Sequence, residues 1–116
     1  MLKRLYYEEN TDGSPNVYRI RATGNGKPEP ILAEQTNDEN PSISSGGQII
    51  VFERTSSTTG HDIWGKNLNS ESEFSIVTVA GDQRFPRISP DSRFVAFQSG
   101  DADNWSVLAI STDREP

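Results

Sequence analysis

The sequence predicts an all-β protein built from repeated antiparallel sheets, and two observations lead to this prediction. A stretch of about 45 residues recurs along the 116-residue chain, which is a period typical of repeat architectures. Apolar residues come in short alternating bursts, separated by Gly, Pro, Asn, Asp and Ser. Alternation is the pattern of a half-buried strand, and those five residue types favour turns. The sequence contains no apolar stripe at helical spacing.

The repeat is clearest in two segments that each begin with a proline. Residues 41–54 read PSISSGGQIIVFER and residues 86–99 read PRISPDSRFVAFQS, with their prolines, isoleucines and second-strand phenylalanines in the same columns. The same offset carries residues 3–9 onto the apolar part of the first segment. Because the register holds along the whole chain, we expect the same supersecondary unit to recur.

Each complete unit is predicted to contain four short strands. These strands are rich in β-branched and aromatic residues, which fit a pleated, half-buried surface. They cover residues 3–9, 16–21 and 29–33 in the first unit, 42–44, 48–54, 62–68 and 74–79 in the second, and 87–89, 93–99 and 106–111 in the third. The prediction is therefore ten strands, grouped as three, four and three.

The proline-led segments resemble the repeat of TolB-like β-propeller proteins. That repeat has a proline, then Ile-Ser-Pro-Asp, and then a Val-Ala-Phe strand followed by an Asp-Ile-aromatic strand. Residues 86–99 match it well, whereas residues 41–54 depart from it at Ser45 and Gly46, where the pattern has Pro and Asp. The resemblance implies four-stranded antiparallel propeller blades, about two and a half per chain. A β-sandwich with chance similarity is the alternative fold.

On this interpretation residues 1–116 form a single propeller segment, with units at about 1–40, 41–85 and 86–116. Two and a half blades do not close a ring, because propellers have typically about 4–8 blades. The end units would then expose apolar sheet faces and unpaired edges. We therefore expect the chain either to be part of a longer propeller or to self-associate, with a homodimer as the simplest assembly.

The motif itself has a local physical explanation. In the third unit, Ser89 and Asp91 can accept hydrogen bonds from backbone N–H groups, and Pro90 suits the second position of a type I turn. This turn would reverse the chain between the first and second strands. The second strand would then place Phe52 or Phe97 in the core between neighbouring sheets.

Composition excludes several classes of partner. The net charge is −6, and no basic face suits nucleic acid, whose binding requires neutralised phosphates. No apolar run is long enough for a membrane helix, so we expect no membrane insertion.

The sequence says little about localisation. Charges throughout residues 1–20 argue against a signal peptide there. The bacterial cytoplasm and periplasm both remain open.

Catalytic and metal-binding signals are weak. His61 is the only histidine, and a nucleophilic triad would have to use it. Asp101 and Asp103 have the spacing of calcium ligands, but the aligned segments do not repeat them and no Glu closes the motif. No Gly-rich phosphate loop is present. We therefore predict no cofactor and no enzymatic activity.

The candidate binding residues lie in predicted loops at one end of the blades. Loops 37–40 and 82–85 should ring the central channel, and loops 55–61 and 100–105 should lie outside them. The residues selected there are Glu39, Asn40, His61, Arg84, Phe85 and Trp105. Trp64, in contrast, is expected in the core between blades.

The function predicted from these features is a non-enzymatic propeller module that binds a protein or peptide. The TolB-like resemblance implies a scaffold role in the bacterial envelope without identifying the partner. Two alternatives remain: the gating propeller of a prolyl-oligopeptidase-type serine peptidase, and a sugar-binding propeller with Trp105 as its stacking platform. The chain has no G-x-S-x-G segment, so it would supply only the gating part of such a peptidase.

Overall fold

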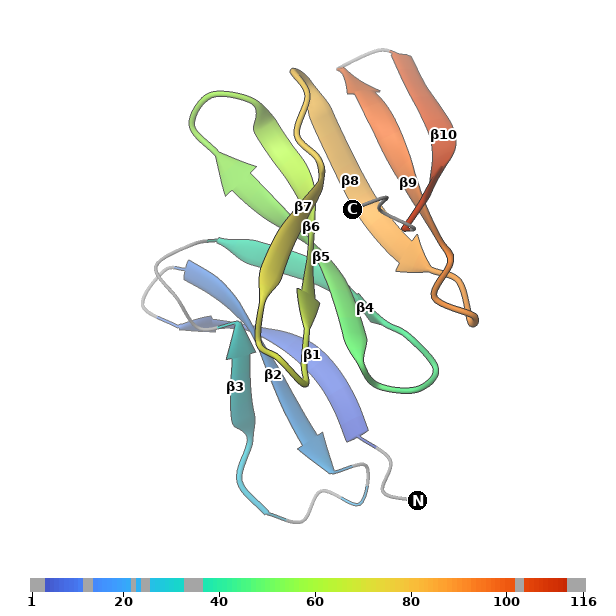
Figure 1. The fold of residues 1–116 in the computed structure, drawn as a ribbon. Coiled ribbons are helices and arrows are strands. Elements are labelled where there is room, and N and C mark those ends of the chain that lie inside the picture. Colours follow the sequence, from blue (N-terminus) through green and yellow to red (C-terminus); the bar gives the residue numbers. More distant parts are fainter. Residues whose placement is uncertain are drawn as a thin grey trace.

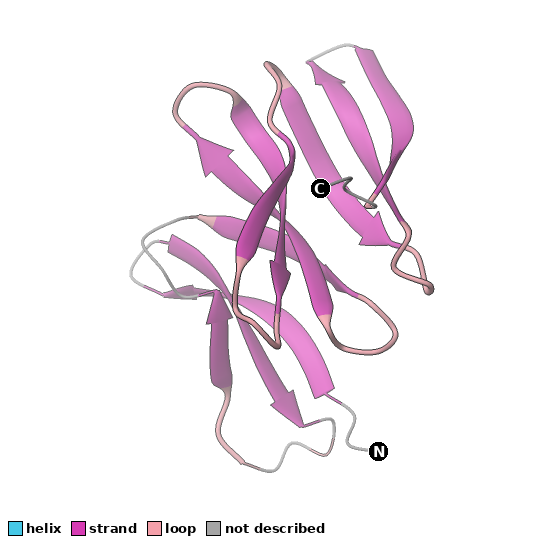
Figure 2. Cartoon of the chain, viewed as in Figure 1, coloured by secondary structure: helices cyan, strands magenta, loops and turns pink. Residues whose placement is uncertain are grey.

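The structure is a computed structural model that describes residues 4–11, 14–21, 23, 26–32, 37–101 and 104–112. Every regular element within these ranges is a strand, as Figure 2 shows. The prediction of an all-β fold with ten antiparallel strands is confirmed. The described ranges include no helix that is long and apolar enough to span a membrane.

The strands form three antiparallel sheets that pack against one another in chain order (Figure 1). The first sheet consists of β1 (Arg4–Thr11), β2 (Ser14–Arg21) and β3 (Glu29–Leu32). The middle sheet consists of β4 (Asp38–Ile43), β5 (Ile49–Ser56), β6 (Gly60–Asn67) and β7 (Glu73–Val77). The third consists of β8 (Asp82–Ile88), β9 (Phe94–Asp101) and β10 (Asn104–Ser111). Strands that are consecutive within a sheet pair with each other, so each sheet is a meander.

Two apolar clusters join the three sheets. The buried members are Val17, Leu32, Ile50 and Phe52 between the first and middle sheets, and Val51, Ile63, Val95 and Phe97 between the middle and third sheets. Alternate residues of β5 therefore face opposite neighbours, as strand geometry requires. Phe52 is fully buried and Phe97 is 5% exposed, which confirms that both lie in the core. Trp64 packs against the first cluster, also as predicted.

The turn between β8 and β9 forms as the sequence predicted. The Ser92 backbone N–H donates to the Ser89 carbonyl, with 2.9 Å between nitrogen and oxygen. The Ser89 hydroxyl oxygen accepts from the Phe94 N–H at 3.0 Å, and the Asp91 carboxylate accepts from the Arg93 N–H at 3.1 Å. These bonds satisfy the donors of the reversing backbone, so the motif has a structural role here.

The inner strands begin earlier than the sequence predicted. β4 starts at Asp38 and β8 at Asp82, whereas strands were expected only after the proline that leads each repeat. In both strands the pairing shifts by one residue beside that proline, which is a β-bulge. A proline is tolerated in a bulge because the ladder needs no N–H there. The prediction of loops at 37–40 and 82–85 is therefore wrong, except that residue 37 itself lies outside a strand.

Candidate functional site

The inner strands β4 and β8 lie side by side and carry four of the six candidate residues. The strands are joined where the Ile88 N–H donates to the Ser42 hydroxyl at 3.1 Å. Near the start of each strand, side chains gather around the carboxylate of Glu53 on β5. We call Asn40, Glu53, Arg84 and Phe85 the inner-strand cluster.

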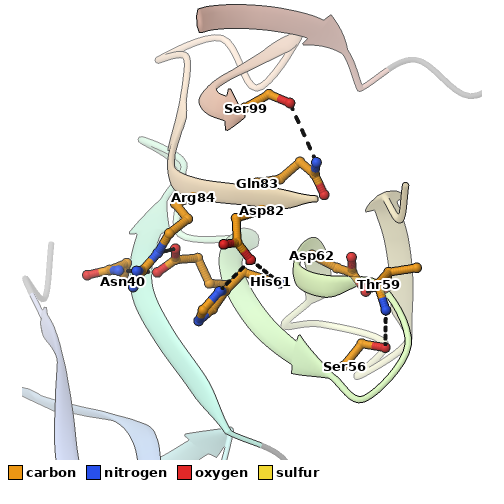
Figure 3. A network of polar contacts seen from close by, with 10 residues as sticks. Asn40, Ser56, Thr59, His61, Asp62, Asp82, Gln83, Arg84 and Ser99 are labelled. Atoms are coloured by element: carbon orange, nitrogen blue, oxygen red, sulfur yellow. Dashed lines mark hydrogen bonds and ion pairs between the residues drawn. The ribbon is translucent and has the colours of Figure 1, made fainter. Parts of the chain in front are cut away.

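Glu53 is the centre of this cluster, although its side chain is only 1% exposed. Its Oε1 accepts from Arg84 Nε at 2.7 Å, across the boundary between the middle and third sheets. Its Oε2 accepts from the Asn40 side-chain amide. Figure 3 shows Arg84 and Asn40 pointing toward each other around this position. A buried carboxylate needs such partners, because an unpaired charge in the core would be strongly unfavourable.

A related contact, made to the backbone instead of to a side chain, occurs one sheet earlier in the chain. Glu8 on β1 occupies the position that Glu53 holds on β5, because each lies opposite the buried residue of its hairpin partner, Val17 and Ile63 respectively. Glu8 accepts from the backbone N–H of Asn40 at 2.8 Å. In both cases a carboxylate of one sheet binds the bulge region of the next sheet's inner strand.

Arg84 is both a partner of Glu53 and the support of an aromatic ring. The hydrogen bond to Glu53 raises the pKa of Arg84 against the opposing effect of burial, and the charges of Glu53, Glu39 and Asp82 add to it. The guanidinium carbon lies 5.1 Å from the centroid of the Phe85 ring, within the range of cation–π attraction. Arg84 therefore fixes one face of Phe85, whose side chain remains 42% exposed.

The backbone is strained at equivalent positions of the two bulges. Asn40 has φ of 51° and Phe85 has φ of 55°, both in the left-handed region. Asn tolerates this region because its short polar side chain bonds locally, and here it bonds Glu53. A bulky aromatic residue has no such compensation and is a true outlier there. Local conformation therefore does not explain why position 85 holds Phe.

His61 is linked to the same region through Asp82 at the start of β8. The His61 ring Nδ1 and its backbone N–H each lie 3.0 Å from Asp82 Oδ1, and Figure 3 shows the pair. The side-chain and then the backbone hydrogen bond from His61 hold the pKa of Asp82 below its ordinary value. His61 lies in β6 rather than in the predicted loop, because the connection after β5 is only three residues long.

The lowered pKa of Asp82 gives an expected pH dependence of stability. A depressed acid pKa contributes stability that is present above the unfolded-state value, about 3.9, and is lost as the pH falls through the folded-state value. We expect Asp82→Asn to lower the free energy of unfolding at neutral pH by less than about 1 kcal/mol, because the carboxylate is 41% exposed. The difference from wild type should shrink as the pH falls below the unfolded-state value of about 3.9 and through the lower folded-state pKa of Asp82, as measured by urea unfolding at several pH values. Glu71→Gln, which removes an exposed carboxylate in the turn after β6, is the control and should change the free energy of unfolding at neutral pH by about 0.5 kcal/mol or less.

The remaining predicted residues divide between this region and the far side of the third sheet. Glu39 lies opposite Glu53 in the β4–β5 pairing and acts on Arg84 through its charge. Trp105 lies in β10, opposite Gly100, and is 44% exposed. It was expected in a loop, but the hairpin connection spans only two residues. The acidic turn at positions 101 and 103 lies outside the residues whose side chains the structure describes.

Sequence reasoning missed two acidic residues that organise the site. The repeat offset of 45 residues aligns Glu8 with Glu53, and by itself this alignment indicates only the register of the repeat. A charged residue that recurs in the middle of an apolar strand is itself a signal, because a buried charge has to be paired. Asp38, which is fully buried and binds Arg54, gives no such signal, because it lies in the polar stretch 37–40 and the residue aligned with it is Gln83.

Comparison with known proteins gives the fold of the chain. No protein-family model matches the sequence, and no curated protein matches it. Among solved structures, a protein assigned as TolB from Agrobacterium tumefaciens superposes with a TM-score of 0.77 over 93% of the chain, at 18% identity. TolB from Acinetobacter baumannii superposes with a TM-score of 0.77 over 95%, at 20% identity. The chain spans 38% and 27% of the lengths of those proteins, so it has the fold of a partial TolB-type propeller.

Proposed function

We propose that this propeller segment is a non-enzymatic module that binds a protein or peptide at the inner-strand cluster. The observation that carries the proposal is Phe85. Its ring is exposed, it is supported by Arg84, and its backbone is held in a left-handed conformation that disfavours a bulky residue. Such strain amounts to about 1–3 kcal/mol and occurs preferentially at ligand-contacting positions.

The charged residues around Phe85 indicate what kind of peptide could bind there. Arg84 is already engaged by Glu53, whereas Asp82 is 41% exposed and Glu39 is half-buried nearby. The chain as a whole carries a net charge of −6. These features favour a peptide segment with an apolar or aromatic side chain against Phe85 and a Lys or Arg beside it, since complementary charge guides association. Trp105 lies apart from this cluster, so the proposal does not depend on a sugar-stacking role for it.

The experiment that tests the proposal uses the residue found at the equivalent position of the other bulge. We expect Phe85→Asn to retain or raise the melting temperature, because Asn tolerates the left-handed region. The same variant should weaken binding to peptides selected from a random displayed library by at least about tenfold, the effect of losing an aromatic hot spot. Selected peptides should be enriched in basic residues next to apolar ones.

Val79→Ser is the matched control, because Val79 is an exposed apolar residue between β7 and β8 that is outside the cluster. Its binding should equal that of the wild type. Selection that enriches no peptide, or a Phe85→Asn variant that binds as tightly as the wild type, would refute the proposed site.

The proposal includes the absence of catalysis by this chain. The His61 side chain bonds Asp82, and within the described part of the chain no hydroxyl group bonds the His61 ring to serve as a nucleophile. We therefore expect no turnover of ester, peptide or glycoside substrates by the purified chain. Turnover that disappears in His61→Ala would contradict this expectation, because it would make His61 a catalytic residue.

A further inference from the structure

A cavity lies between the first and middle sheets, away from the inner-strand cluster. It has a volume of about 130 Å³ and is partly open to solvent. Its walls come from β2 and β3 on one side and from the end of β6 and the β6–β7 turn on the other, which lie side by side in Figure 1. Four charged residues line it, namely Arg19, Glu29, Lys66 and Glu71. A cavity with so many charged groups is suited to a polar ligand.

Lys66 supplies the first cation of this cavity. Its Nζ reaches across the boundary between the sheets and donates to the Ile31 carbonyl of β3 at 3.0 Å. An ammonium group has three N–H donors, and no carboxylate of the described residues lies within ion-pair distance of this one. The Lys66 side chain is half-buried, so water screens its charge only in part. Both charge and donors are therefore left for an anionic group in the cavity.

Arg19 supplies the second cation, and its pairing is incomplete. One terminal nitrogen lies 3.3 Å from Glu29 Oε2, but the Glu29 side chain is 55% exposed, so this ion pair is weak. Arg19 Nε is buried and has no acceptor among the described residues. Burial opposes the charge of Arg19, but hydrogen bonds with Tyr6 and Glu29 outweigh it and raise the pKa, so the guanidinium stays charged. A carboxylate in the cavity would give this guanidinium a further acceptor.

The two carboxylates of the cavity lie closer to solvent than the two cations. Glu29 is 55% exposed, compared with 21% for Arg19. Glu71 is exposed in the β6–β7 turn, where its backbone N–H donates to the Asn67 carbonyl at 2.7 Å. Positive charge thus lies inside the cavity and negative charge at its mouth. The mouth repels a polyanion, whereas a molecule that carries one charge of each sign matches both parts.

We propose that this cavity binds a small zwitterion of the α-amino acid class, with its carboxylate against the two cations and its ammonium group toward the two glutamates. A cavity of about 150 Å³ holds one benzene molecule, so the volume here suits a ligand of the size of glycine or alanine. Ile31 and Leu68 line the cavity and pack against the apolar cluster between these sheets. They provide an apolar wall for a small side chain, while charge-assisted hydrogen bonds orient the two ends.

The test is titration of the isotope-labelled chain with glycine, followed through the NMR shifts of its backbone amides. Glycine should cause saturable shifts at the cavity residues, with a dissociation constant on the order of 1 mM because so small a ligand makes few contacts. Acetate and methylammonium, which each carry only one of the two charges, should bind at least about fivefold more weakly.

Lys66→Met should weaken glycine binding at least about tenfold, because it removes a charge-assisted hydrogen bond. Arg93→Met is the matched control, since it removes an exposed cation of the third sheet, and it should bind glycine as the wild type does. The spread of amide shifts in each variant should match that of the wild type, which shows that the fold is kept. Lys66→Met that binds glycine as tightly as the wild type would overturn the proposal.

Glu71→Gln discriminates a zwitterion site from a site for simple anions. It should weaken glycine binding about two- to fivefold, the effect of one exposed charge, and should not weaken acetate binding. Absence of saturable shifts in the cavity across the millimolar range would overturn the proposal, as would acetate binding as tightly as glycine. Phe85→Asn should bind glycine normally, so failure of the peptide-binding proposal is distinguishable from failure of this one.

Discussion

Phe52→Ala is expected to lower the free energy of unfolding by about 3–5 kcal/mol, the usual loss when a buried Phe is truncated. Phe52 is fully buried between the first and middle sheets, where it packs with Val17, Leu32 and Ile50. Truncation leaves a cavity lined by both sheets, and neither sheet can close it alone because each is held by its own strand pairing. The measurement is urea-induced unfolding followed by tryptophan fluorescence.

Phe97 holds the position aligned with Phe52, in the interface between the middle and third sheets. Phe97→Ala should lower the free energy of unfolding by an amount in the lower part of that range. Phe97 is 5% exposed, and its hairpin partner Leu108 is 48% exposed, so part of the cavity is open to water. Phe94→Ala is the matched control on the same strand, because Phe94 points away from the core and is 47% exposed. The control should change the free energy of unfolding by about 0.5 kcal/mol or less. A Phe97→Ala variant as stable as this control would contradict the alignment of Phe97 with Phe52 as core residues.

Most of the fold could be predicted because the same pattern of apolar and turn residues repeats along the chain. Alternating apolar residues identified the ten strands, and the constant offset grouped them into sheets. What the sequence did not reveal is where the inner strands begin. A proline normally ends a ladder because it lacks an N–H, so residues 38–41 and 82–86 were not predicted as strand. The bulge beside each proline removes that conflict, but a bulge depends on pairing with β5 and β9, which local sequence does not specify.

Only part of the candidate site could be predicted, because local sequence does not specify how long the hairpin connections are. Glu39, Asn40, Arg84 and Phe85 were selected as neighbours of the central axis, and the structure brings them together around Glu53. Trp105 is expected beside them only if the hairpin loop is longer than the two residues that connect β9 and β10. A shorter connection extends β10 by two residues beyond its predicted start and places Trp105 in that strand, where it is 44% exposed.

The repeated carboxylates connect the fold to the site. Glu8 and Glu53 each bind across a sheet boundary, so the contacts that hold neighbouring sheets in register also position the inner-strand cluster. The apolar clusters are non-directional, whereas a carboxylate with two fixed partners specifies one arrangement. Phe85 is exposed with one face against Arg84, and Arg84 is held by Glu53. The presentation of Phe85 therefore depends on the same buried carboxylate that aligns β5 with β8.

Arg54→Met is expected to destabilise the chain by about 3–5 kcal/mol, which is the loss typical when one partner of a buried ion pair is removed. Arg54 binds Asp38 through two hydrogen bonds, of 2.9 Å from Nε and 3.2 Å from Nη2, and the Asp38 side chain is fully buried. A third bond, of 2.9 Å, joins Arg54 to Glu73. Burial opposes the charge of Arg54, but the bonds to Asp38 and Glu73 outweigh this and raise its pKa.

Methionine is chosen because it keeps most of the apolar stem of the side chain while removing the charged group. The guanidinium carbon lies 5.0 Å from the Phe52 ring centroid and 4.9 Å from that of Trp64, so the substitution also removes the cation–π contacts with both rings. The expected loss therefore combines these contacts with the charge that compensates Asp38. Because Arg54 links β4, β5 and β7, the loss should be seen in the cooperative unfolding of the middle sheet.

A double-mutant cycle with Asp38→Asn separates this electrostatic loss from altered packing. Neutralising Asp38 removes the buried charge that Arg54→Met leaves without its partner, so the double variant should be more stable than the sum of the single effects by about 1–3 kcal/mol. Lys66→Met is the control, because Lys66 is a half-buried cation on β6 that donates to the Ile31 carbonyl, at 3.0 Å, and forms no ion pair with the described residues. Its effect should be below about 1 kcal/mol. Strictly additive effects of the Arg54 and Asp38 substitutions would show that the pair does not stabilise the middle sheet, and the role assigned to Arg54 would then be wrong.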